Sequence, residues 1–234
     1  ASQNKVEMNI LLMAAFKLLL FKYAQHEEIV IGTSVNNRNE KLTEMIGPMA
    51  NLVVVKSKLT STSNFTEYVK ELDGIYQSGE AYNSMPFDKL VKELAPKKDM
   101  SRTALFDVLY QYEENDVVLP TIAGLEALIV ETNLGYGKYD LNLFLQRTND
   151  RIDGQLVFNL DYFDKSTIEV FVAHFYQLLE GVLTAPSAPF SELNTLTEAE
   201  ENELLNMLNN EDVDYPKDKT ILDLKCSMSL NDTL

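Results

Sequence analysis

The sequence predicts a layered α/β (α+β) sandwich, in which helices pack on a mixed β-sheet. Three observations lead to this fold class. Short β-branched runs that suit strands are interspersed with amphipathic stretches of helical period. One pair of alternating segments is joined by a polar, turn-rich connection, which indicates an antiparallel hairpin. The chain also contains no internal repeat and no low-complexity tract.

The N-terminal segment predicts one helix and two strands. Residues Val6–Tyr23 are apolar on most faces, so we expect a helix that is covered on more than one side. Ile29–Thr33 and Leu52–Leu59 are β-branched and predict strands. The apolar run Ile10–Phe21 is interrupted by Lys17 and is shorter than the roughly 20 residues that a membrane span needs. A buried core helix is the better interpretation.

Two helices with recognisable starts follow. Asn64 and Glu67 have capping-box spacing, which predicts a helix start. The buried face of this helix is expected to consist of Phe65, Tyr68, Val69, Leu72, Ile75 and Tyr76. Pro86 suits the first turn of the next helix, and Pro96 helps to end it.

Further strands are predicted in the second half of the chain. Leu105–Tyr112 and Leu125–Thr132 have strand composition. Leu141–Leu145 and Leu156–Leu160 alternate between apolar and polar or opposite-face residues, and Thr148–Gly154 between them is polar. This pair is the expected antiparallel hairpin.

Two helices complete the predicted elements. The first is long and runs from about Ser166 to Leu183, with Ser166 and Glu169 as its expected capping pair. The second is short and begins near Thr197, again with a capping pair that includes Glu200.

Composition excludes several classes of protein. The 234 residues carry a net charge of −16, which argues against a surface that binds nucleic acid, because phosphates would be repelled. The single cysteine, Cys226, excludes an internal disulfide and fits a reducing compartment. No signal-peptide pattern follows the first apolar run. We therefore expect a soluble, cytoplasmic protein without membrane contact.

The residue types that usually carry catalysis are scarce. His26 precedes a strand and is expected on the surface, whereas His174 in the long helix is expected on the helix surface or as a hydrogen-bonded core residue. Neither has a second histidine at metal-binding or general-base spacing, so we expect no metal site. Cys226 has no signature of an activated thiol, and the chain lacks a phosphate-binding glycine loop. Read alone, the sequence contains no catalytic group.

Recognition chemistry is more plausible in the loops. Arg38 follows the first strand, where it either locks a carboxylate by bidentate pairing or is an exposed loop residue. Asn51 precedes the second strand and can serve as a turn or cap residue. Between Met85 and Tyr112, a predicted helix leads into a charged loop that contains Ser101, and a predicted strand follows. The loop is either a functional loop or a solvated turn.

Taken in order, these segments resemble the C-terminal half of a condensation domain from a nonribosomal peptide synthetase. The resemblance covers nearly the whole chain. The matching segments are Gly32–Arg38, Ile46–Asn51, Met85–Asp88, Asp99–Arg102, Leu105–Phe106, Tyr139–Leu141, Asp161–Asp164 and Asp214–Ile221. Such a half is a lobe with the fold of chloramphenicol acetyltransferase.

The resemblance implies which residues shape the substrate tunnel. The motif positions that line or shape it are Gly32, Gly47, Asn51, Pro86, Phe87, Asp99, Ser101, Arg102 and Asp140. In the family, a His-His-x-x-x-Asp-Gly motif in the N-terminal lobe supplies the histidine that assists amide formation, and this sequence lacks that motif. By the same likeness, Arg38 would form a structural salt bridge with the Asp of that motif. No catalytic residue is expected in this chain, which would be inactive alone.

The resemblance also implies the organisation and partners of the chain. Residues 1–190 would form the lobe, and residues 191–234 would form a linker towards an adenylation domain. No cofactor would bind directly, because the substrates arrive on the phosphopantetheine arms of carrier proteins. The partners would be the N-terminal lobe, peptidyl carrier domains and the adenylation domain, with possible self-association through an exposed lobe interface. The alternatives are a noncatalytic docking module and a lobe of an epimerisation domain, although Tyr215-Pro216 favours a linker towards adenylation.

Overall fold

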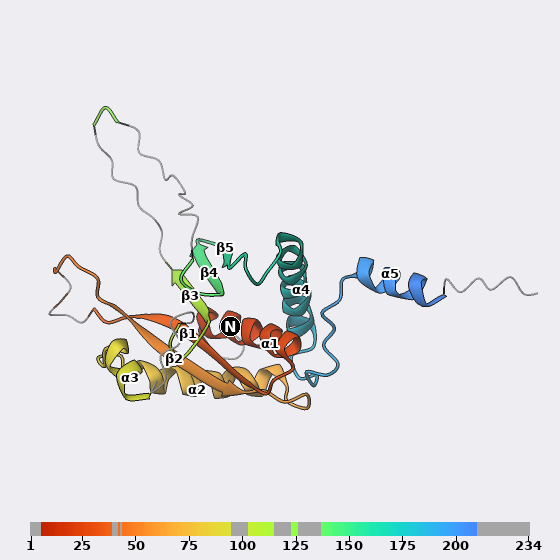
Figure 1. The fold of residues 1–234 in the computed structure, drawn as a ribbon, viewed down its shortest axis with the longest axis horizontal. Helices are drawn as coiled ribbons and strands as arrows, with labels where there is room; N and C mark the ends of the chain where they lie inside the picture. The colour runs from red at the N-terminus through yellow and green to blue at the C-terminus, as the bar shows by residue number, and fades with distance from the viewer. Residues whose placement is uncertain are drawn as a thin grey trace, which may run out of the picture. The chain divides into compact units, whose positions relative to one another are not determined.

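The computed structural model of the protein describes residues 6–38, 42, 44–94, 103–114, 123–125 and 137–209. The chain divides into two compact units, Ala1–Thr195 and Leu196–Leu234. The first unit contains a five-stranded mixed sheet with helices packed on it, so the predicted fold class is confirmed (Figure 1).

The sheet has the strand order β2-β1-β3-β4-β5. The strands are β1 (Glu28–Asn36), β2 (Ala50–Lys58), β3 (Val108–Glu114), β4 (Leu141–Thr148) and β5 (Arg151–Phe158). β1 pairs antiparallel with β2, β4 pairs antiparallel with β5, and β3 runs parallel to both of its neighbours. Strands β1, β3 and β4 therefore begin at one end of the sheet, called here the N-end, and finish at the opposite C-end.

Helix α1 (Met8–Ala24) is the centre of the core. All ten residues from Ile10 to Leu19 are buried, as the apolar pattern on most faces predicts. The helix contacts β1, α2 (Phe65–Glu80) and α4 (Lys165–Thr184). In Figure 1, α1 lies between the sheet and α4. A helix enclosed in this way has no solvated stripe, so its sequence lacks the usual amphipathic period.

Lys17 lies inside this enclosed helix and is fully buried. Its Nζ donates hydrogen bonds to the carbonyl oxygens of Ile29 in β1, at 2.9 Å, and Val55 in β2, at 2.7 Å. Burial penalises the charged ammonium and lowers the pKa of Lys17 to about 7. The single polar interruption of the apolar run thus fastens α1 to two neighbouring strands.

The start of α2 is as predicted, and the start of α4 is not. The Asn64 side chain caps α2 by accepting a hydrogen bond from the Glu67 amide at 3.0 Å. Helix α4 has Asp164 as its N-cap, so the predicted cap of Ser166 with Glu169 is wrong. Because the helix begins earlier, Ser166 is already inside the first turn, and its hydroxyl cannot take the capping position.

Several strand boundaries also differ from expectation, most clearly in β3, β4 and β5. β3 begins at Val108 instead of Leu105, and Leu105 itself has a φ of 74°, in the left-handed region and not in the extended region of a strand. The β4–β5 hairpin is confirmed, but its strands extend further than predicted and leave a tight turn at Asn149, whose φ is 54°. Leu160 lies beyond β5 and is exposed. Of the predicted strand Leu125–Thr132, the structure describes only Leu125, which is not in a strand.

The second unit is described as far as the end of helix α5 (Glu198–Asn209). The predicted capping pair is confirmed, because the Thr197 amide donates to Glu200 Oε2 at 2.8 Å and the Glu200 amide donates to Thr197 Oγ1 at 3.4 Å. Across the described residues of both units, none of the helices combines the length and apolarity required to cross a membrane.

Candidate functional site

Gly32, one of the predicted site residues, lies on the face of the sheet that points away from α1. Thr33 pairs with Tyr110, whose ring contacts Phe16 of α1, so the neighbouring Gly32 faces the opposite side. A Cβ atom on Gly32 would lie only 2.1 Å from the ring of Phe106. Because Gly32 has no side chain, an aromatic ring contacts the backbone of the sheet directly at this position.

Phe106 is the middle member of an aromatic cluster formed by Phe87, Phe106 and Tyr139. It is 4% exposed, and its ring centre lies 5.3 Å from that of Tyr139 with the planes 18° apart. The ring centre of Phe87, the first residue of α3 (Phe87–Leu94), lies 5.6 Å from that of Phe106. The cluster joins α3 to the segments that enter β3 and β4, over the middle of β1.

Asn51, in β2, holds the segment that leads into α3. Its amide nitrogen donates to the carbonyl oxygens of Asn83, at 2.8 Å, and Met85, at 2.6 Å. Its Oδ1 accepts a hydrogen bond from the Phe87 amide at 3.2 Å. Asn51 therefore caps α3 from another element, which is more than the local turn that the sequence indicates.

Replacing Asn51 by alanine should destabilise the chain by about 1–2 kcal/mol and expose the start of α3, because all three hydrogen bonds are lost. Chemical denaturation measures the first effect, and hydrogen exchange of the Phe87 amide measures the second. N51D is the matched control, since it keeps the acceptor for the Phe87 amide and loses both donors. Equal loss of Phe87 protection in both variants would contradict the capping role.

Arg38 lies just beyond β1, at the C-end of the sheet. Its guanidinium donates to the carbonyl oxygens of Leu42, at 2.7 Å, and Met45, at 2.5 Å, and more weakly to Gly47 at 3.4 Å. The side chain is exposed and organises the loop between β1 and β2. Its salt bridge with a carboxylate of another lobe stays a prediction.

The structure brings some predicted residues together and separates others. Gly32 and Phe87 both contact Phe106, and Asn51 binds the Phe87 amide. Pro86 immediately precedes α3, and its carbonyl accepts hydrogen bonds from the first turn of that helix. Arg38 and Gly47 meet at the C-end, whereas Asp140 lies directly before β4, at the N-end. Asp99, Ser101 and Arg102 lie outside the described residues.

Two residues of the aromatic cluster were not predicted as site residues. Phe106 and Tyr139 fall within matching segments, but neither was assigned a role in the site. A glycine within a strand is the signal that could have located them, because it often marks a place where another group approaches the backbone closely.

The histidines occupy structural positions, as their sequence contexts indicate. His26 is exposed, and its Nδ1 lies 3.3 Å from the amide of Glu28. His174 is buried in α4, and its Nδ1 lies 2.6 Å from the Tyr23 hydroxyl. Among the residues that the structure describes, no group of His, Cys, Asp and Glu could hold a metal ion. The site geometry thus suits recognition and support of a neighbouring segment.

Residues 1–205 match the family described as Condensation domain. Bacitracin synthase 3 of Bacillus licheniformis is 32% identical over 222 residues, which are 94% of this chain and 4% of that protein. Surfactin synthase subunit 1 of Bacillus subtilis (strain 168) is 29% identical over 225 residues, which are 96% of this chain and 6% of that protein. The chain therefore spans only a small part of these relatives.

Solved structures agree with this assignment. The X-domain from teicoplanin biosynthesis is 28% identical with a TM-score of 0.76, and the match covers 83% of this chain and 45% of the X-domain chain. A four-domain nonribosomal peptide synthetase bound to AMP and glycine shares the fold, with a TM-score of 0.77 at 18% identity over 86% of this chain and 16% of that chain. The chain belongs to the condensation-domain family of nonribosomal peptide synthetases.

Proposed function

We propose that residues 1–190 are the C-terminal lobe of a condensation domain and that residues 191–234 lead towards an adenylation domain. The complete domain forms an amide bond between two carrier-bound substrates. The amine of the acceptor attacks the thioester carbonyl of the donor, so that a C–N bond forms and the C–S bond breaks. The proton of the amine leaves, and the phosphopantetheine arm departs as a thiol.

The share of solved single-domain chains that this chain matches supports the proposal. The match takes in 83% of this chain but only 45% of the X-domain chain. The condensation domain of a Monacolin K polyketide synthase shares the fold, with a TM-score of 0.73 at 15% identity. That match covers 81% of this chain and 45% of the other chain. Both proportions support a chain equivalent to about half of a whole domain.

The residues of this chain support a structural role in that reaction. The sequence has only His26 and His174, one exposed and one bound to Tyr23, so neither is placed to assist the amine. Arg38 is exposed at the C-end on a loop that its own guanidinium orders. There it can reach a carboxylate of the N-terminal lobe and hold the His-His-x-x-x-Asp-Gly loop in shape.

The isolated chain should therefore give no amide product from carrier-loaded donor and acceptor, and addition of an N-terminal lobe should restore turnover. Product formation is measured by mass spectrometry of the carrier-bound peptide. R38A should weaken restoration, whereas R151A, a control in the exposed β4–β5 hairpin, should not. Turnover by the chain without an added lobe would refute the proposal.

A docking module is the second candidate, and one structure favours it. An X-domain that is 28% identical to this chain, with a TM-score of 0.69 over 84% of this chain and 44% of that chain, was solved as a complex with OxyB from teicoplanin biosynthesis. A lobe that is separated from its partner should expose the apolar surface that the partner covers. It should therefore also associate with itself. Light scattering should show a mass that increases with concentration, and a constant monomer mass would contradict self-association.

A further inference from the structure

We propose that a pocket at the N-end of the sheet binds a small organic amine with an apolar body. The pocket has a volume of about 490 Å³. It lies between the last turn of α1, the first turns of α4 and the first residues of β1, β3 and β4. This volume is in the range of small-molecule sites. The proposal rests on the walls and charges of this pocket and does not require a second lobe.

The walls of the pocket are apolar and partly fixed. Leu20 and Ile168 line it together with the rings of Tyr23, Phe163 and Phe171. The rings of Tyr23 and Phe171 make an edge contact at 5.0 Å. The Tyr23 hydroxyl is held by His174 Nδ1 at 2.6 Å, so that the tyrosine ring has a defined position. Such a pocket can bury an aromatic or aliphatic body with little rearrangement.

The charged residues that line the pocket are all acidic. They are Glu28, Asp107 and Asp140; the imidazole of His26 also lines the pocket, and within the part of the chain that the structure describes no Lys or Arg does. Each lies at or directly before the start of a strand, so the parallel order of β1, β3 and β4 brings the three together. The pocket therefore attracts cations and repels anions.

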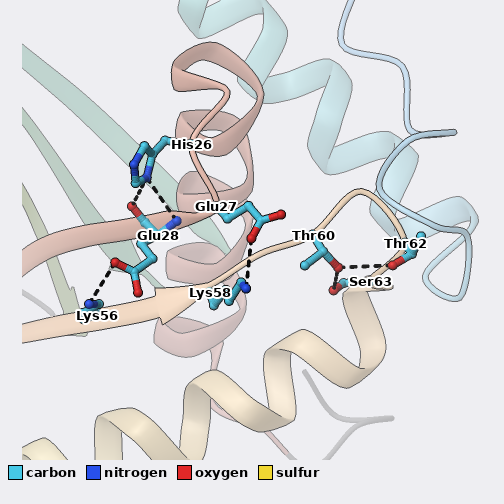
Figure 2. A network of polar contacts seen from close by, with 8 residues as sticks. All are labelled: His26, Glu27, Glu28, Lys56, Lys58, Thr60, Thr62 and Ser63. Atoms are coloured by element: carbon cyan, nitrogen blue, oxygen red, sulfur yellow. Dashed lines mark hydrogen bonds and ion pairs between the residues drawn. The ribbon is translucent and has the colours of Figure 1, made fainter.

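Two of these carboxylates already have partners. Figure 2 shows Glu28 paired with Lys56 of β2, at 3.0 Å, in a network along the β1–β2 edge. This hydrogen bond lowers the pKa of Glu28, which stays ionised. Asp107 Oδ1 accepts a hydrogen bond from the Thr103 hydroxyl at 3.2 Å. Both side chains contribute negative charge while their positions are set by the protein.

Asp140 differs from the other two. Its main chain is tied down, because its amide donates to the Asp107 carbonyl at 3.0 Å and its carbonyl accepts from the Asn159 amide at 3.0 Å. Within the described ranges, no residue forms a hydrogen bond or ion pair with its carboxylate. A half-buried carboxylate beside apolar walls gains a charge-assisted hydrogen bond when an ammonium group enters. Asp140 is therefore the expected anchor of the amine.

The test compares three probes of similar shape: 2-phenylethylammonium, 2-phenylethanol and 3-phenylpropanoate. Each is titrated into the full chain, and amide chemical shifts are followed by NMR. The ammonium probe should perturb residues around the pocket, such as Ala24 and Thr167, and should bind about tenfold more tightly than the alcohol. Binding of the carboxylate probe should be weaker still. Equal affinity of ammonium and alcohol, or shifts located elsewhere, would overturn the proposal.

Variants separate the pocket from general attraction to an acidic protein. D140N should weaken binding of the ammonium probe about tenfold and leave binding of the alcohol unchanged. D150N is the matched control, since Asp150 is an exposed acid in the β4–β5 turn. A24W places a large ring at the exposed mouth and should abolish binding of both probes even if D140N is poorly folded. The same effect of D140N and D150N, or unaltered binding in A24W, would refute the site.

Discussion

Replacing Gly32 by alanine should destabilise the protein by about 1–3 kcal/mol, because a Cβ atom there would overlap the ring of Phe106. The ring cannot move away freely, since it is buried and packs against the rings of Phe87 and Tyr139. The change therefore has to disturb the aromatic cluster or the sheet itself. Urea denaturation of G32A and the parent chain measures the loss.

Two comparisons make this result specific. G74A introduces the same methyl group in the middle of α2, where nothing lies within 4 Å of the added atom, and should stabilise by about 0.5–1 kcal/mol. In an F106A background, G32A should cost little, because the obstructing ring has been removed. If G32A destabilises equally with and without Phe106, the close approach is not the cause.

The second large effect concerns Lys17 and pH. Its pKa is about 7 in the folded chain, against an ordinary value of 10.5. Below pH 7 both the folded and the unfolded chain carry the proton on Lys17, so its contribution to the free energy of unfolding does not change with pH. Between pH 7 and 10.5 the unfolded chain keeps the proton that the folded chain has lost, and stability rises by up to about 1.4 kcal/mol per pH unit. The neutral amine still has two N–H groups for the carbonyls of Ile29 and Val55.

Denaturation between about pH 7.5 and about pH 9.5, a window that ends below the ordinary pKa of tyrosine, measures this slope. K17M should reduce it strongly. It should not remove it, because burial also lowers the pKa of Lys22. K70M, a change at an exposed lysine of α2, should leave the slope intact. An unchanged slope in K17M would show that Lys17 keeps its proton in the folded chain.

Local patterns were sufficient to predict most elements. The period of α2 and its Asn64 cap, and the alternation in the β4–β5 hairpin, depend on neighbouring residues in the chain, and these predictions are confirmed. The cap of α4 was wrong because Asp164 and Ser166 both suit an N-cap by residue type. Which of them starts the helix depends on how Ile168 and Phe171 reach the core, and this is not a local property.

The site was less accessible from the sequence for the same reason. Motif likeness selected Gly32, Asn51 and Phe87, but only the folded chain shows that Asn51 binds the amide of Phe87 and that Phe106 lies on Gly32. Asp140 came from the same set of motifs and lies at the other end of the sheet from Arg38. Its nearness to Asp107 and Glu28 follows from parallel strand order, which no single motif encodes.

The enclosure of α1 has a consequence for biosynthesis. Phe16 of this first helix packs against Phe171 and Phe175 of α4, which are made more than a hundred residues later. During translation, a helix that is apolar all round therefore leaves the ribosome long before its cover exists. We expect the nascent chain to depend on chaperones over this interval, and stalling synthesis before α4 should leave it open to proteolysis.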